Sequence, residues 1–183
     1  MLPIFITGNQ SKADYLSRQL GVTLEHQKVD LDELQSTDLH VIVEHKLRQA
    51  YDICQKPVLV EDVSLEFVAL GDLPGPYIKW FVDHAGDEAC CRMLDGFTDR
   101  SAIIRCTFGY YDGKRMEFFD SELPGTIAKQ PRGENGFGFD RFFVNAGKDI
   151  TRAEMSQEEN ERTYATMMKP FAQVREFIQT LTD

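Results

Sequence analysis

The sequence predicts an α/β fold: an elongated, two-lobed domain with a central mixed sheet, flanking helices and one long hairpin. Three observations support this class. Short apolar runs alternate with amphipathic helical segments over the first third of the chain, and Asp112-Gly113 separates two strand-like runs. Apolar residues at helical spacing then follow near the C-terminal end. Because no repeat or linker interrupts the chain, we expect residues 1–183 to form one domain.

The first third should have the order strand, helix, strand, helix, strand, which favours parallel pairing. The apolar run Ile4–Thr7 breaks at a glycine turn, and Ser36, Thr37 and Asp38 are candidate caps for the second helix. The predicted elements are strand Ile4–Thr7, helix Lys12–Leu20, strand Val22–Val29, helix Leu39–Cys54 and strand Val58–Val60.

In the rest of the chain, Asp112-Gly113 favours a tight hairpin turn with a positive φ at both central residues. Pro170 suits the first position of the last helix, which has a buried apolar stripe. The predicted elements are helices Tyr77–His84 and Asp87–Leu94, strands Ser101–Tyr111, Lys114–Glu122 and Arg141–Val144, and helices Ser156–Met168 and Pro170–Leu181.

Composition limits the partners that the protein can have. The chain is 42% hydrophobic and 27% charged, as in ordinary globular domains. Its formal net charge of −10 disfavours nonspecific binding to nucleic acid or to an anionic membrane, since both need basic patches. Local lysines and a divalent cation can still bind a small polyanion, so a nucleotide remains a possible substrate.

The cysteines and the N-terminus favour a cytoplasmic protein. The four cysteines form no CxxC pair and have no histidine at zinc-binding spacing, so we expect reduced thiols. Met1–Thr7 lacks the features of a signal peptide, and no apolar run approaches the length of a membrane span.

The most informative residues are the adjacent carboxylates Glu61 and Asp62, which follow an apolar strand. Carboxylates at the rim of a sheet can hold a hard cation and its phosphate ligand. Successive strand side chains face opposite sides, so the two should have different roles. Glu33 is a candidate second carboxylate of a magnesium site, although an exposed strand end and a surface acid would also explain these residues.

Two loops could bind the rest of a nucleotide. In Thr7-Gly8-Asn9-Gln-Ser-Lys12, a helix N-terminus and a lysine could hold phosphate, although for this segment taken alone a capped turn with a solvated lysine is the favoured explanation. In Gly136-Phe137-Gly138-Phe139-Asp140, an exposed ring could stack on a base and Asp140 could accept hydrogen bonds from it. The alternative is a hydrophobic anchor that fixes the loop.

Together these segments resemble the inosine triphosphate pyrophosphatase family. The match runs in order over nearly the whole chain. It comprises Thr7-Gly-Asn-x-x-Lys12, Val60-Glu-Asp62, Leu70-Gly-x-Leu-Pro-Gly-Pro-Tyr-Ile-Lys-Trp80, Gly136-Phe-Gly-Phe-Asp140 and Thr151-x-Ala-Glu-Met155.

The resemblance implies an elongated two-lobed fold with the active-site cleft between the lobes, hydrolysis of a nucleoside triphosphate to monophosphate and pyrophosphate, Mg²⁺ dependence and a homodimer. It implies that Glu33 and Asp62 hold the metal and that Asp62 activates water, with Lys12 and Glu61 beside it as catalytic residues. The substrate-binding residues that it implies are Thr7, Gly8, Asn9, Lys12, Lys46, Lys79, Phe137, Gly138, Phe139 and Asp140.

The sequence departs from the family pattern at the end that reads the base. Val63 stands where the family has Ser or Thr. Asn160 and Tyr164-Ala165-Thr166 stand where the family has a lysine and Ser-His-Arg. Replacing buried donors relaxes or redirects discrimination between bases, unless Arg162, Tyr164 or Lys169 substitutes for them.

Three functions therefore remain open. The expected one is removal of deaminated purine nucleotides such as ITP, dITP and XTP. The alternatives are the same chemistry on a different or modified nucleotide, and a catalytically silent nucleotide-binding protein. A plain structural protein would leave five matched segments unexplained.

Overall fold

The computed structural model describes residues 1–181 and contains two compact units. The first unit comprises Met1–Asp62, Cys106–Asp120 and the segment that starts at Lys169, and the second comprises Val63–Arg105 and Ser121–Met168. The sheet is mixed and has seven strands, in the order β2-β1-β3-β5-β6-β7, with β4 paired to β3. The predicted α/β class with a mixed sheet and flanking helices is confirmed.

The strands are β1 (Ile4–Ile6), β2 (His26–Gln27), β3 (Val58–Phe67), β4 (Pro74–Gly75), β5 (Ser101–Tyr111), β6 (Met116–Ile127) and β7 (Phe143–Asn145). The α-helices are α1 (Gln10–Leu20), α2 (Leu39–Cys54), α3 (Ile78–His84), α4 (Asp87–Arg92), α5 (Gln157–Thr163) and α6 (Phe171–Thr180). Short 3₁₀ turns are η1 (Val68–Leu70), η2 (Gly138–Arg141) and η3 (Arg152–Glu154), and η4 (Tyr164–Met168) is a π-helical turn.

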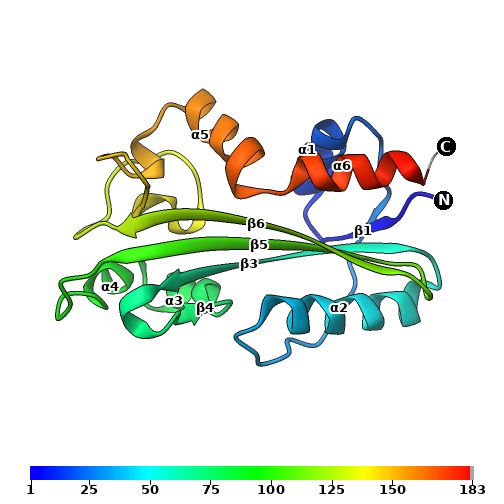
Figure 1. Ribbon diagram of the computed structural model, residues 1–183, viewed down its shortest axis with the longest axis horizontal. Coiled ribbons are helices and arrows are strands. Elements are labelled where there is room, and N and C mark those ends of the chain that lie inside the picture. The colour runs from blue at the N-terminus through cyan, green and yellow to red at the C-terminus, as the bar shows by residue number, and fades with distance from the viewer. Residues whose placement is uncertain (182–183) are drawn as a thin grey trace. The chain divides into compact units, whose positions relative to one another are not determined.

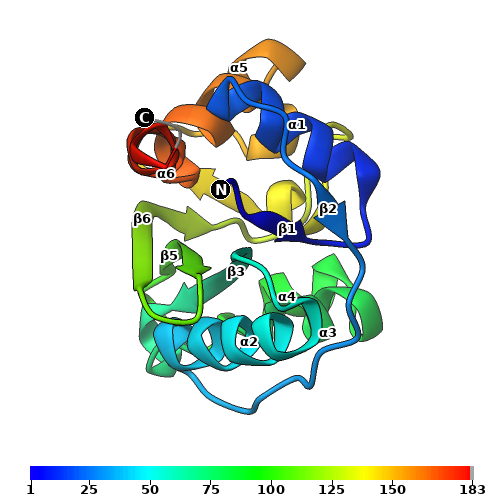
Figure 2. The same ribbon diagram turned by 90° about the vertical axis from the view of Figure 1, so that its right-hand side faces the viewer.

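The first unit has the predicted parallel start. Phe5 of β1 lies opposite His26 of β2 and Leu59 of β3, and both pairings are parallel. Helices α1 and α6 lie side by side on one face of these strands, and α2 covers the other face (Figures 1 and 2). The apolar side of α2 packs on β3 in a buried cluster of Val43, Leu47, Ala50, Val58 and Val60.

Side-chain caps begin both helices that precede β3. The Asn9 side chain accepts a hydrogen bond from the Lys12 backbone N–H, and α1 therefore begins two residues before the predicted start. Among the three cap candidates for α2, Asp38 is the cap, since its carboxylate accepts from the N–H groups of His40 and Val41. The predicted bounds Leu39–Cys54 are confirmed.

Strand β3 corrects one prediction. We expected the strand to stop at Glu61, but it continues to Phe67, so the adjacent carboxylates lie within the strand. The residues after Asp62 are themselves strand-forming, and Ser64 satisfies the buried Glu66 carboxylate by donating a hydrogen bond over 2.9 Å. Glu61 and Asp62 therefore do not end the strand.

The hairpin is confirmed but its turn is not the predicted type. Strands β5 and β6 are joined through Asp112–Arg115, and only Gly113 has a positive φ, of 92°. The Asp112 carboxylate accepts from the backbone N–H groups of Lys114 and Arg115, which closes a longer loop. Strand β6 consequently starts later than predicted and runs further, to Ile127.

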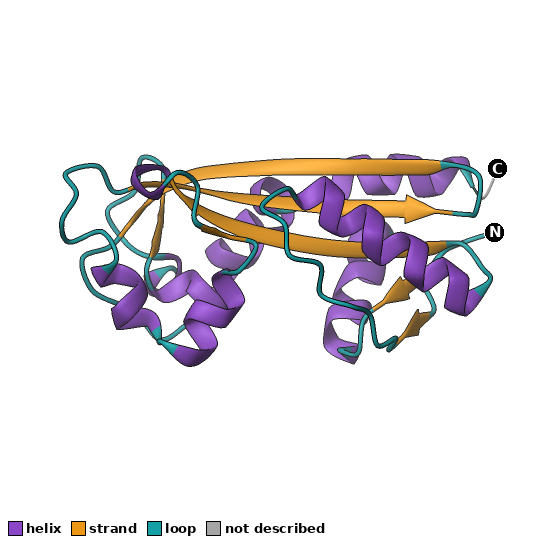
Figure 3. Cartoon of the chain, turned by 90° about the horizontal axis from the view of Figure 1, so that it is seen from below, coloured by secondary structure: helices purple, strands orange, loops and turns teal. Residues whose placement is uncertain are grey.

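The second unit has its own core. Helices α3 and α4 lie on one face of its strands and α5 on the other (Figure 1), and both units combine strands with helices (Figure 3). A buried cluster of this unit includes Leu65, Phe67, Cys91, Ile104 and Phe142. The predicted helix 156–168 is α only to Thr163 and continues as the π-helical turn η4. The predicted strand 22–29 is correct only for His26–Gln27.

The cysteine prediction is confirmed, because all four thiols lie in the described part of the chain and none forms a disulfide. Within residues 1–181, no helix has the length and apolar character that crossing a membrane requires.

Candidate active site

Strand β3 directs Glu61 and Asp62 to opposite faces of the first unit, as alternation along a strand requires. Strand β1 pairs with β3 at Ile4–Val58 and Phe5–Leu59, so both carboxylates lie just beyond the paired residues. The Thr7–Lys12 turn leaves β1 at the same level. The partners of the two carboxylates confirm that they have different surroundings.

Glu61 lies between two lysines. Its Oε2 is 2.7 Å from Lys12 Nζ of α1, and its Oε1 accepts a hydrogen bond from Lys169 Nζ, just before α6. The carboxylate is only 2% exposed. Burial alone would raise the pKa of Glu61, but the positive charges of Lys12 and Lys169 lower it to about 2. Glu61 therefore stays ionised throughout the physiological range.

Asp62 belongs to a second cluster, on the α2 side. Lys46 Nζ is 2.6 Å from Asp62 Oδ2 and 3.5 Å from Glu33 Oε2. Burial lowers the pKa of Lys46, but the two carboxylates outweigh it and the pKa is raised. Asp62 is 18% exposed, so unlike Glu61 it is accessible to solvent. The structure thus brings together the residues that the resemblance assigned to the metal.

The donor set fits Mg²⁺. Two carboxylate oxygens, from Glu33 and Asp62, converge on the single ammonium group of Lys46. Mg²⁺ usually takes one or two carboxylates and completes its octahedron with water and substrate phosphate. Within the described residues no group of three or more His, Cys, Asp or Glu side chains could hold a metal ion on its own.

The Thr7–Lys12 turn presents the N-terminus of α1. The Thr7 hydroxyl accepts from the Asn9 N–H over 3.2 Å, and Asn9 in turn caps the helix. Gly8 permits close packing, since a Cβ there would lie 3.1 Å from Lys28 Cδ. The remaining N–H groups of the first turn and the Lys12 charge favour an anion.

In the second unit, the loop 136–140 contains one exposed ring, Phe137, and one ring that packs on the core, Phe139. Phe137 is 68% exposed and lies edge-on to Tyr164, with ring centroids 5.9 Å apart. Phe139 packs against the buried core. Gly136 and Gly138 both have positive φ, and a Cβ on Gly136 would lie 2.2 Å from the Asp140 carboxylate. The exposed position and the anchoring position therefore belong to different rings, and stacking of Phe137 on a base stays a prediction.

Asp140 is buried, and protein groups occupy both of its oxygens. Oδ1 accepts from Arg152 Nε over 2.8 Å, and Oδ2 accepts from the Phe137 N–H and from Asn160 Nδ2 over 3.1 and 3.3 Å. Arg152 is fully buried. Arg152 Nη1 and Asn160 Oδ1 are buried without a hydrogen-bond partner. Asp140 therefore fixes the Phe137 loop from a buried position, and its contact with substrate stays a prediction.

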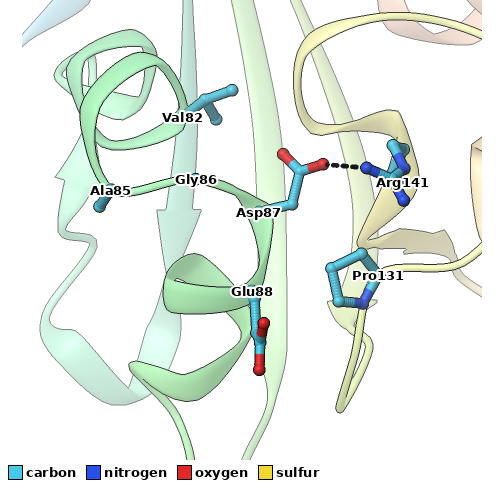
Figure 4. A pocket seen from close by; sticks show the side chains of 7 residues that line it. All are labelled: Val82, Ala85, Gly86, Asp87, Glu88, Pro131 and Arg141. Carbon is cyan, nitrogen blue, oxygen red and sulfur yellow. Dashed lines mark hydrogen bonds and ion pairs between the residues drawn. The ribbon is translucent and has the colours of Figure 1, made fainter.

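The remaining predicted residue, Lys79, is on α3 and forms an ion pair with Asp83. A pocket in the second unit contains none of the predicted site residues (Figure 4). Across it Asp87 is 3.0 Å from Arg141, which also donates to the Gly133 carbonyl. This pocket is therefore not the predicted site.

Two residues of the site were not predicted in their observed places. Lys169 was considered only as a substitute for missing base-reading groups, but it contacts Glu61, which lies 108 positions away. Arg152 occupies the unspecified position of Thr151-x-Ala-Glu-Met155, in a segment that also carries other charged residues, so no local signal singled it out. Val63, where the resemblance implies Ser or Thr, packs against the core of the second unit.

The fold and these clusters define an α/β protein with a lysine- and carboxylate-rich site suited to phosphate. The solved structure of the Staphylococcus aureus Ham1 protein matches with a TM-score of 0.84, covering 98% of this chain and 99% of that one at 24% identity. A HAM1 protein from Coxiella burnetii matches with a TM-score of 0.83 over 98% of this chain and 100% of that one, at 24% identity. These two similarities concern the fold.

The chain belongs to the Ham1 family, whose model matches residues 3–168. It is similar to the inosine triphosphate pyrophosphatase of Batrachochytrium dendrobatidis, at 41% identity over 98% of this chain and 95% of that protein. It is also similar to the inosine triphosphate pyrophosphatase of Yarrowia lipolytica, at 44% identity over 86% of each. The family suggested by the sequence motifs is confirmed.

Proposed function

We propose that the protein is an enzyme that hydrolyses an acid anhydride bond, a Mg²⁺-dependent nucleoside triphosphate pyrophosphohydrolase that converts its substrate to the monophosphate and pyrophosphate. Family membership and the names of the relatives support this activity. The proposed substrates are the deaminated purine nucleotides ITP, dITP and XTP. The homodimer, the cytoplasmic location and an active-site cleft between two lobes remain predictions.

The observation that carries the proposal is the Lys46–Asp62–Glu33 cluster. Glu33 and Asp62 would hold the cation, and Lys46 would turn to a phosphate oxygen. When bound, Mg²⁺ would neutralise and polarise the phosphate chain. Lys12 and the N-terminus of α1, with Thr7 and Asn9, would bind the phosphates, and Lys79 would approach the chain as a further cation.

The two adjacent carboxylates differ in what they can do to water. A general base must lie within hydrogen-bonding reach of the water that it activates and must be basic enough to accept a proton from it. Asp62 is partly exposed, whereas Glu61 is 2% exposed and paired on both oxygens. The pKa of about 2 also makes Glu61 a poor proton acceptor. We therefore assign the base to Asp62 and give Glu61 an electrostatic role.

Phe137 would stack on the base, because its ring is largely exposed and its backbone is fixed by Asp140. Asp140 would contribute by holding the Phe137 backbone in place. Aromatic stacking accepts any base, so the ring itself does not determine specificity.

A second candidate is the same reaction on a base with a different hydrogen-bonding edge. A carboxylate only accepts hydrogen bonds, so Asn160 must turn its NH₂ group toward Asp140, which leaves Oδ1 as an acceptor without a partner. Asn160 therefore offers no cationic donor at the position where the resemblance implies a lysine, and this favours a base with a different hydrogen-bonding edge.

The test is pyrophosphate release with Mg²⁺ from ITP, dITP, XTP, the ordinary triphosphates and modified triphosphates. We expect turnover of the deaminated purines and a loss of at least about 100-fold in kcat for Asp62→Asn. Asp52→Asn, the same change at an exposed position of α2, is the matched control and should retain activity.

The outcomes separate the candidates. Turnover of some other nucleotide would keep the chemistry and move the specificity. Full activity in Asp62→Asn would reject the assigned base. If no nucleotide were consumed although nucleotides raised the melting temperature, the protein would be a silent binder.

A further inference from the structure

Lys169 is a buried cation that the proposed mechanism does not use. Its side chain is 3% exposed, and it lies at the start of the C-terminal segment of the first unit, immediately before Pro170 and α6. Its Nζ donates to Glu61 Oε1 and lies 3.5 Å from Cys106 Sγ. A buried lysine requires a carboxylate partner, and here that partner is a carboxylate which already binds Lys12.

Lys12, Glu61 and Lys169 form a cluster of three charges with an unequal distribution. Two ammonium groups and one carboxylate give the cluster a formal charge of +1. Glu61 and Lys169 are almost completely buried, whereas the Lys12 side chain is 41% exposed. The net positive charge is therefore accessible only at Lys12, at the N-terminus of α1.

The neighbouring thiol does not change this count. Burial raises the pKa of Cys106 to about 12, so the thiol stays neutral beside Lys169 and Glu61. It contributes a weak hydrogen bond to Glu61 Oε1 at 3.8 Å and no charge. Without Lys169, Glu61 and Lys12 would form a neutral pair, and Lys12 would have little net field to offer an anion.

We propose that Lys169 is a positioning residue for phosphate binding: it neutralises Glu61 from the buried side, so that Lys12 keeps a net positive charge for the substrate. The inference rests on the proposed function, since it deepens the role of the same phosphate site. In this inference Glu61 orients the Lys12 side chain. Lys169 offsets the negative charge of Glu61, which would otherwise cancel the positive charge of Lys12.

The test measures binding of inorganic tripolyphosphate by calorimetry, which needs no base and no turnover. Lys169→Met makes the cluster neutral and should weaken binding about tenfold. Lys169→Met combined with Glu61→Gln restores the formal charge to +1 and should return affinity to within about threefold of wild type. Lys169→Arg keeps the charge and should resemble wild type. The loss in Lys169→Met should shrink at high salt, because an exposed charge is screened.

Melting temperature separates charge from folding. The double variant lacks both buried charges, so it remains testable even where Lys169→Met folds poorly. Wild-type affinity in Lys169→Met would overturn the inference, as would a double variant that binds no better than Lys169→Met. Tripolyphosphate binding that follows this pattern without any nucleotide turnover would support the role of Lys169 and reject the proposed activity. Nucleotide turnover by a wild-type protein that does not bind tripolyphosphate would support the proposed activity and reject the role of Lys169.

Discussion

Replacing Glu61 by glutamine should change stability in a way that depends on pH. Burial acts to raise the pKa of Glu61, but Lys12 and Lys169 lower it from an ordinary 4.5 to about 2. A carboxyl group whose pKa is depressed by folding stabilises the native state above its unfolded pKa. That contribution is lost as the pH falls through its folded pKa. The window for Glu61 therefore extends from about pH 5 down to about pH 2.

The magnitude follows from the two pKa values. One pKa unit corresponds to about 1.4 kcal/mol, so ionised Glu61 contributes roughly 3 kcal/mol near neutral pH. Linkage reduces this to about 1.5 kcal/mol at about pH 3. We expect the difference in unfolding free energy between wild type and Glu61→Gln to fall by about half over this range. Urea unfolding at several pH values measures it.

Glu176→Gln is the matched control, because Glu176 is exposed on α6. Its unfolding free energy should stay within about 0.5 kcal/mol of wild type at every pH. A Glu61→Gln difference that remained constant from neutral to acid pH would refute the reasoning. It would mean that the charge of Glu61, as distinct from its shape, does not stabilise the fold.

Two further predictions concern the second unit. Arg152→Met leaves buried Asp140 without its cationic partner and should lower the unfolding free energy by about 3–5 kcal/mol. Arg141→Met, at a half-exposed ion pair, should cost less than about 1 kcal/mol, and equal losses in the two variants would contradict the argument. Phe137→Ala should change stability by less than about 1 kcal/mol but raise the KM for a nucleotide about tenfold. An unchanged KM would exclude stacking on this ring.

Elements with a strong local signal could be predicted from the sequence. Helix Leu39–Cys54 has apolar residues at helical spacing and the Asp38 cap, and both of its ends are correct. Strand Ser101–Tyr111 is correct because the alternating run is long and a turn follows it. Strand β3 was predicted too short, because Glu61 and Asp62 looked like a strand end. Their neutralising lysines come from other elements, which a local pattern does not contain.

The candidate site divides in the same way. The residue pattern suggested Glu33 and Asp62, and resemblance to the family added Lys46. The structure places both carboxylates within 3.5 Å of the Lys46 ammonium group. The contact of Lys169 with Glu61 spans 108 positions and depends on where α6 packs beside α1. Nothing local to Lys169 distinguishes it from a solvated lysine. Long-range charge pairs are thus the part of the site that sequence patterns cannot supply.

The alternation of a single strand explains how two neighbouring carboxylates acquire opposite properties. Side chains at successive positions face opposite sides, so Glu61 enters the interface with α1 and α6 while Asp62 faces α2. On the first side two lysines hold the carboxylate permanently charged and inaccessible. On the second side one lysine and Glu33 leave it partly exposed. A shift of one residue in the register of β3 would exchange these environments. The β1–β3 pairing at Phe5 and Leu59, shortly before the carboxylates, therefore determines which of the two is buried between lysines and which stays partly exposed.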